Sequence, residues 1–203
     1  MRELGLKAHY AKPWTKTTKD CDFSKELKNV LKRNFNPVKP NAVWCTDITY
    51  IWTKDDGFVY LTSVMDLYSR KIIAWTLSRT MMADEVIVCL KIAQSKRYMD
   101  EAIVIHSDRG SQYVSKLYNE LTQNMTTSYS GKGNPWDNET IESFHALIKR
   151  EWLNRYIPEN YEQTYSLVFE YIEGFYNIER IHSFCDYMSP NDYEKEFVKT
   201  LSA

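Results

Sequence analysis

The order of secondary-structure signals along the chain predicts an α/β fold, in which helices cover a β-sheet. Three segments rich in β-branched and aromatic residues come first, at 42–53, 58–67 and 70–78. Helix-length segments then alternate with one short apolar segment, 102–107, which is typical of a buried strand. A chain of 203 residues, 43% of them hydrophobic, is long enough to bury such a sheet without a disulfide or metal. We therefore expect one globular domain with at most a small appendage.

The first forty residues differ in composition from the rest of the chain. They are polar and rich in lysine, with three prolines, and predict a linker that contains one short helix over 24–33. The three β-rich segments come next, and Asp56-Gly57 between the first two is a hairpin signal. A three-stranded antiparallel meander is the simplest arrangement of these segments.

Two helices are expected around the short strand. The segment 81–97 carries too many apolar residues for a helix with one buried stripe, so we expect it to pack on the sheet. The segment 111–124 places Tyr113, Leu117 and Leu121 at four-residue spacing, which is one face of a helix.

The glycine-containing segment 128–138 predicts a loop, and the chain then becomes helical. Asn138 is a suitable N-cap, and a helix from 139 to about 156 has an apolar stripe at Ile141, Phe144, Ile148 and Trp152. A second long helix is expected over 161–178.

Composition excludes a disordered chain, because aromatic residues make up 14% of it. The formal net charge of −1 argues against a protein that coats nucleic acid by bulk attraction alone. This figure hides a gradient: residues 1–50 carry +5, residues 51–150 carry 0 and residues 151–203 carry −6. The gradient is compatible with a polyanionic partner approached from one side, and equally with two ordinary solvated surfaces.

Cellular location is predicted from the cysteines and from hydropathy. The four cysteines form no CxxC pair, so reduced thiols are expected. No apolar run approaches the ~20 residues of a membrane span, and the N-terminus lacks the apolar core of a signal peptide. These observations predict a cytoplasmic protein with no membrane partner.

Three acidic residues stand out by position. Asp47 lies inside the first predicted strand, where a charge is costly unless it is paired or bound to a cation. Asp108 directly follows the buried strand 102–107, and Glu142 lies on the helix after the loop. Carboxylates in these places can converge on Mg²⁺ or Mn²⁺, and two such ions suit phosphodiester chemistry. Each acid alone also has an ordinary structural explanation, such as an Asx turn at Asp108.

The sequence resembles a known family in four ordered motifs between residues 40 and 195: WCTDITYI, HSDRGSQY, GNPWDNETIESFHALIKRE and YIEGFYNIERIHSFCDYMSP. They are similar to the catalytic domain of bacterial transposases of the insertion sequence three family, relatives of retroviral integrases. The resemblance implies a ribonuclease-H-like fold, with a mixed five-stranded sheet flanked by helices. It also implies an Asp-Asp-Glu triad that binds two Mg²⁺ or Mn²⁺ ions, and the triad falls on Asp47, Asp108 and Glu142.

The resemblance also predicts domains and partners. The opening MRELGLKAHY is similar to the end of the family's upstream helix-turn-helix region, so 1–40 is expected to be a basic linker with a remnant of that region. Residues 41–203 would form the integrase-type catalytic core with a C-terminal helical tail. DNA, both element ends and target, is the implied partner of a homo-oligomer that associates with the nucleoid when acting. An upstream-frame helix-turn-helix protein is a further possible partner.

Two other acids compete for places in the triad, and the sequence departs from the family pattern in two places. Glu139 lies one turn before Glu142, but Glu142 matches the motif. Asp66 lies in the second strand, in a context where the family has no ligand. The 33 residues between Asp108 and Glu142 are a couple fewer than usual, and the segment 185–187 replaces the more usual Leu-Gly-Tyr.

Several residues near the triad are candidate DNA contacts. Lys149 lies two helical turns after Glu142 on nearly the same face, where a cation could hold a phosphate, although it could equally be a solvated lysine. Arg150 and the loop residue Lys132 are weaker candidates. Trp136 could stack on a base or be anchored in the core. His106, two residues before Asp108, is a supporting residue or a core histidine; no zinc-binding pattern is present.

The functional hypothesis is therefore a metal-dependent DNA transposase that cleaves 3′ ends and transfers strands. A ribonuclease-H-like nuclease that stops at hydrolysis is one alternative, because the same triad performs both reactions. A truncated, non-catalytic DNA-binding remnant is the other.

Overall fold

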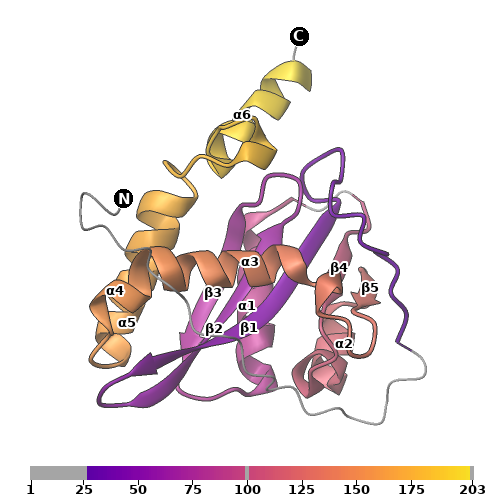
Figure 1. Cartoon of the computed structure of the whole chain (residues 1–203). Coiled ribbons are helices and arrows are strands. Elements are labelled where there is room, and N and C mark those ends of the chain that lie inside the picture. The colour runs from indigo at the N-terminus through magenta and orange to yellow at the C-terminus, as the bar shows by residue number, and fades with distance from the viewer. Residues whose placement is uncertain (1–26, 99–100, 202–203) are drawn as a thin grey trace.

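The computed structural model of the protein describes residues 27–98 and 101–201. Its centre is one mixed sheet in the strand order β3-β2-β1-β4-β5 (Figure 1). The first three strands pair antiparallel, and β4 and β5 add to β1 in parallel. The strands are β1 (Val43–Thr53), β2 (Gly57–Asp66), β3 (Ile72–Ser78), β4 (Val104–Ser107) and β5 (Thr126–Tyr129). The predicted meander and the mixed five-stranded sheet are confirmed.

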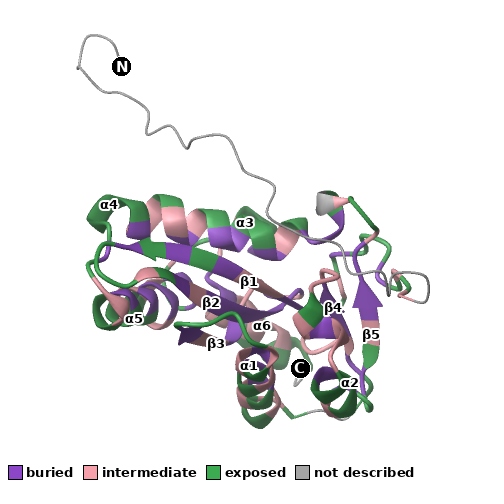
Figure 2. Ribbon diagram, turned by 90° about the horizontal axis from the view of Figure 1, so that it is seen from below, coloured by how far each residue is buried: buried purple, intermediate pink, exposed green. Residues whose placement is uncertain are grey.

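Helices cover both faces of the sheet, with α3 on one side and α1 and α2 on the other (Figure 2). Two helices continue into π-helical turns, α3 into Lys149–Leu153 and α5 into Glu170–Tyr176. The helices are α1 (Ala83–Lys96), α2 (Lys116–Leu121), α3 (Glu139–Ile148), α4 (Asn154–Tyr156), α5 (Tyr161–Phe169) and α6 (Pro190–Leu201). In the described ranges, no helix is long and apolar enough to cross a membrane.

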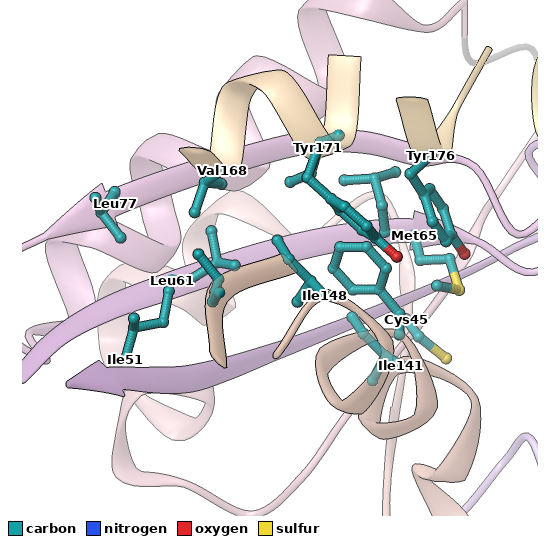
Figure 3. Close-up of a cluster of buried hydrophobic side chains, with 14 of the residues drawn as sticks. Cys45, Ile51, Leu61, Met65, Leu77, Ile141, Ile148, Val168, Tyr171 and Tyr176 are labelled. Carbon is teal, nitrogen blue, oxygen red and sulfur yellow. The ribbon is translucent and has the colours of Figure 1, made fainter. Parts of the chain in front are cut away.

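Alternation along β1 sends side chains into two separate cores. Cys45 and Ile51 point toward α3 and α5, into the cluster drawn in Figure 3. Trp44 points to the opposite face, into the cluster formed with α1 and α2. The predicted packing of the 81–97 helix on the sheet is confirmed by Val86 and Leu90, which are both buried there.

Residues of the C-terminal motif hold α3 and β3 in place. Arg180 donates to both carboxylate oxygens of Glu151, at 2.7 and 2.9 Å, and the Tyr171 hydroxyl donates to the same carboxylate at 2.6 Å. The Asn177 side chain bonds both backbone groups of Ile72 at 3.0 Å. Because these bonds join distant segments, the motif fixes the helix that carries Glu142.

Some of the predicted local structure was wrong. The segment 128–138 begins inside β5, whereas the sequence pattern predicted a loop there. The helix expected over 111–124 is a 3₁₀ turn and a shorter helix, divided at Ser115, whose side chain caps α2. Within the described part of 24–33, residues 27–33 are coil and turn, not helix. Asn138 occupies the N-cap position of α3, but its side chain makes no capping hydrogen bond.

Candidate active site

The parallel pairing of β1 and β4 brings Asp47 and Asp108 to the same end of the sheet. Cys45 and His106 are the last paired residues of the two strands, and each aspartate follows its strand's last paired residue by two positions. Asp47 lies on the face covered by α3, and Glu142 lies in the first turn of that helix. The three candidate acids therefore come from three elements that meet where the short strand β4 ends beside the middle of β1.

The pKa values of Asp108 and Glu142 both respond to the negative charge of Asp47, which indicates that the two side chains lie near it. Burial raises the pKa of Asp108 to about 6, the negative charge of Asp47 adds to this, and the Gly110 N–H that donates to Asp108 Oδ1 at 2.8 Å opposes it. Partial desolvation raises the pKa of Glu142 to about 7, although much of the residue is exposed, and the charges of Asp47, Asp108 and, least, Glu139 raise it further. A bound cation would relieve this mutual repulsion.

The donor set fits a hard divalent cation. Magnesium is usually bound by one or two carboxylates, with waters and substrate phosphates completing its shell. Across residues 27–98 and 101–201, no three acidic, histidine or cysteine side chains are arranged so that they could hold a metal ion by themselves. The three acids would therefore need further ligands from water and substrate phosphate to hold an ion.

His145 contacts Asp47, a pairing that the absence of a zinc-binding pattern does not reveal. Its Nδ1 lies 3.4 Å from Asp47 Oδ2 and its Nε2 lies 3.3 Å from Ser63 Oγ. The ring is buried. Helical spacing could have pointed to His145, because it follows Glu142 by three residues and therefore lies on the same face of the helix.

The ammonium of Lys149 lies inside the site. It donates to Thr49 Oγ1 at 2.6 Å and lies 4.7 Å from the centre of the Tyr50 ring. Burial lowers the pKa of Lys149 to about 8, an effect that Asp47 partly offsets. The description of Lys149 as a solvated lysine is therefore wrong, whereas Lys132 and Arg150 are exposed.

His106 belongs to a polar cluster under β5. Its Nδ1 pairs with Ser128 Oγ at 2.9 Å and its Nε2 with Ser130 Oγ at 3.3 Å. Burial lowers its pKa to about 4, so the ring is neutral at pH 7. Trp136 is 65% exposed, which rules out the alternative that it is anchored in the core, and stacking on a base stays a prediction.

The two rival acids have other surroundings. Asp66 is buried and accepts hydrogen bonds from the backbone N–H groups of Asn41 and Tyr68, at 2.8 and 2.9 Å. This arrangement is that of a structural turn. Glu139 lines an open groove beside Arg180 and His182.

The raised pKa of Asp108 makes stability depend on pH when no metal is bound. The folded carboxyl has a pKa of about 6 against an ordinary value of 3.8, so the folded state binds more protons between these values and stability falls as pH rises. We expect Asp108→Asn to exceed the wild type in unfolding free energy by roughly 1 to 3 kcal/mol at about pH 8, and by little below about pH 4. Urea unfolding in EDTA measures this, and equal stability at about pH 8 would contradict it.

Comparisons with known proteins identify the fold. Two models described as "Integrase core domain" match residues 37–135 and 123–190. The structure is similar to a chain of the simian T-cell lymphotropic virus intasome, with a TM-score of 0.65 and 17% identity over 78% of this chain and 56% of that one. It is also similar to the HTLV-2 integrase catalytic core determined with magnesium, with a TM-score of 0.59 and 15% identity over 78% and 99% of the two chains. The fold is therefore that of a retroviral-type integrase core, ribonuclease-H-like.

Curated relatives give the family. The chain is 40% identical to the IS904 transposase of Lactococcus lactis, over 82% of this chain and 66% of the relative. It is 34% identical to the transposase InsF of IS3 from Escherichia coli, over 97% and 68%. It spans about two thirds of the length of such relatives. The chain belongs to the family of insertion sequence three transposases, which carry an integrase core domain.

Proposed function

We propose that this chain catalyses metal-dependent cleavage at the ends of an insertion sequence and transfer of the freed 3′ ends into target DNA. Asp47, Asp108 and Glu142 are the proposed catalytic and metal-binding residues. The observation that carries the proposal is that β1, the end of β4 and α3 bring the Asp47 carboxyl close enough to raise the pKa of both Asp108 and Glu142. The family membership supports it.

The three carboxyls would hold two divalent ions, Mg²⁺ or Mn²⁺, which activate an attacking oxygen and stabilise a leaving oxygen in phosphodiester chemistry. A relative's core, that of HTLV-2 integrase, has been determined with magnesium. In this chain, His145 fixes the orientation of the Asp47 carboxylate, and Lys149 supplies a positive charge behind it. The protein's own contribution is position and charge neutralisation.

DNA is the proposed partner, held by Lys149 inside the site and by the exposed Arg150 and Lys132 beside it. We also propose that the chain acts as a homo-oligomer, as the trimeric and dimeric forms of the HTLV-2 core suggest. Recognition of the element ends would come from a helix-turn-helix region, in an upstream segment or a separate protein. The proposed remnant of that region, 1–10, lies outside the described residues.

Substitutions of the two neighbouring cations Lys149 and Arg150 should have different effects. Arg150→Met is expected to weaken DNA binding about twofold to fivefold and to lower the salt dependence of binding by about one phosphate contact. Lys149→Met is expected to lower the salt dependence by a similar amount and to lower the cleavage rate as well, because its ammonium is held against Thr49. Fluorescence anisotropy and single-turnover cleavage measure the two effects. The same salt slope in Arg150→Met and the wild type would contradict the assignment of Arg150.

The direct test incubates the purified chain with a labelled terminal-repeat duplex and a target plasmid in Mg²⁺, with an EDTA control. Joined product supports the proposal. Metal-dependent hydrolysis without joining would show that the chain is a nuclease and not a transposase. DNA binding without any cleavage would show that the chain is a non-catalytic, DNA-binding remnant.

A further inference from the structure

We propose that Asp137 is a positioning residue, and that residues 28–33 form a strap holding the loop 130–138 that leads into α3 and Glu142. The effect of the strap on catalysis rests on the proposed function, whereas the strap itself does not. In Figure 1 the strap lies in the indigo segment that runs past β5. Its contacts to the loop join residues about one hundred positions apart.

The strap is built onto the outer edge of the sheet. The Tyr129 N–H donates to the Lys28 carbonyl at 3.0 Å, and the N–H groups of Val30 and Leu31 both donate to Ser128 Oγ at 2.9 Å. Leu31 is buried in the same cluster as Ile141 of α3. An edge strand leaves backbone groups unpaired, so the strap completes the sheet where the loop begins.

Asp137 joins the strap to the loop. Its Oδ1 accepts from Arg33 Nε at 2.6 Å, and its Oδ2 accepts from Asn29 Nδ2 at 2.9 Å and from the Gly131 N–H at 2.7 Å. The Asp137 side chain is only 5% exposed. A buried carboxylate is costly without partners, so the carboxylate draws strap and loop together.

Leu27, directly before the strap, and Ser130 of the loop both contact the turn that carries Asp108. The Arg109 guanidinium donates to the Ser130 carbonyl at 2.6 Å and to the Leu27 carbonyl at 3.2 Å. Asp137 lies two residues before α3, whose first turn includes Glu142. The same contacts therefore set the spacing between the two acids, through a loop that contains Gly131 and Gly133. Release of the strap would leave the start of α3 free to shift.

The conformation of the strap suits this role. Asn29 Oδ1 accepts from the Lys32 N–H at 2.7 Å, which leaves the Asn29 amide group to donate to Asp137. Lys32 and Arg33 both adopt positive φ angles, 48° and 61°, and this turn brings the Arg33 guanidinium back to the loop. Lys32 is the neighbouring exposed cation without a bond to Asp137, so it provides a matched control.

Hydrogen–deuterium exchange tests the strap without metal, DNA or activity. In Arg33→Met and Asn29→Asp, the amides of 130–138 are expected to exchange at least tenfold faster than in the wild type, while those of β1 to β3 are unchanged. Lys32→Met should match the wild type. Unchanged exchange in both strap variants, or equal effects in Lys32→Met, would overturn the proposal. Because Arg33 and Asn29 are not buried in the core, these variants avoid the folding risk of changing Asp137.

Steady-state strand transfer tests the catalytic consequence. Arg33→Met and Asp137→Asn should each lower kcat about tenfold with KM for DNA within twofold, and the double variant should be no worse than the poorer single variant. A rise in KM that depends on salt, with unchanged kcat, would make Arg33 a DNA contact and overturn the positioning role. A wild type without activity would contradict the proposed function alone, because the exchange experiment tests the strap separately.

Discussion

Replacing Asp108 with asparagine is expected to lower the rate of strand transfer on the order of 1,000-fold, equivalent to about 4 kcal/mol of transition-state stabilisation. Asparagine keeps the size of the side chain and the acceptor for the Gly110 N–H. It removes the charge that would hold a divalent ion beside Asp47. Single-turnover assays with a labelled terminal duplex measure the loss.

The matched control for this variant is Glu139→Gln. Glu139 is an exposed acid one turn before Glu142 and faces the groove beside Arg180. We expect the strand-transfer rate of Glu139→Gln to lie within about threefold of the wild type, since Glu139 affects Glu142 less than Asp47 and Asp108 do and its side chain is exposed. A thousandfold loss in Glu139→Gln, with Glu142→Gln active, would exchange the roles of the two glutamates.

Truncating Phe144 to alanine is expected to lower the free energy of unfolding by about 3–5 kcal/mol. The ring is 1% exposed and packs edge-on against Tyr176, with 4.8 Å between ring centres. It belongs to the core between the sheet and the helices that Figure 3 shows. A cavity at this position would remove contacts from both layers at once.

Urea unfolding of Phe144→Ala beside Ser143→Ala tests this packing. Ser143 is the exposed neighbour on the same helix, and its substitution should change stability by no more than about 0.5 kcal/mol. A loss below about 1 kcal/mol in Phe144→Ala would show that α3 is not packed as described.

The sequence pattern predicted those elements whose structure is decided locally. The strands β1 to β3 combine β-branched residues with a hairpin signal, and the apolar stripe of α3 has a clear helical period. The strand β5 has the sequence TTSY, with little apolar pattern, and it exists because it pairs in parallel with β4. Such pairing is a tertiary effect that no local pattern encodes.

The three acids remain a prediction that rests on the family motifs. Spacing along the sequence could not show that the register of Cys45 with His106 brings Asp47 beside Asp108. Asp137 lay inside a motif and was not singled out, because its partners Asn29 and Arg33 are distant in sequence. The charge gradient could not locate a DNA-binding face, since cations such as Arg33 are paired within the protein.

Binding of Mn²⁺ to the metal-free protein, followed by calorimetry at about pH 7, tests most directly whether Asp47, Asp108 and Glu142 form one metal site. Glu142 has a pKa of about 7 in the absence of metal, so binding should release protons and strengthen as pH rises. We expect Asp47→Asn and Asp108→Asn each to weaken binding at least about tenfold and Glu139→Gln to leave it unchanged. If Asp108→Asn binds Mn²⁺ as tightly as the wild type does, the three acids do not form one metal site.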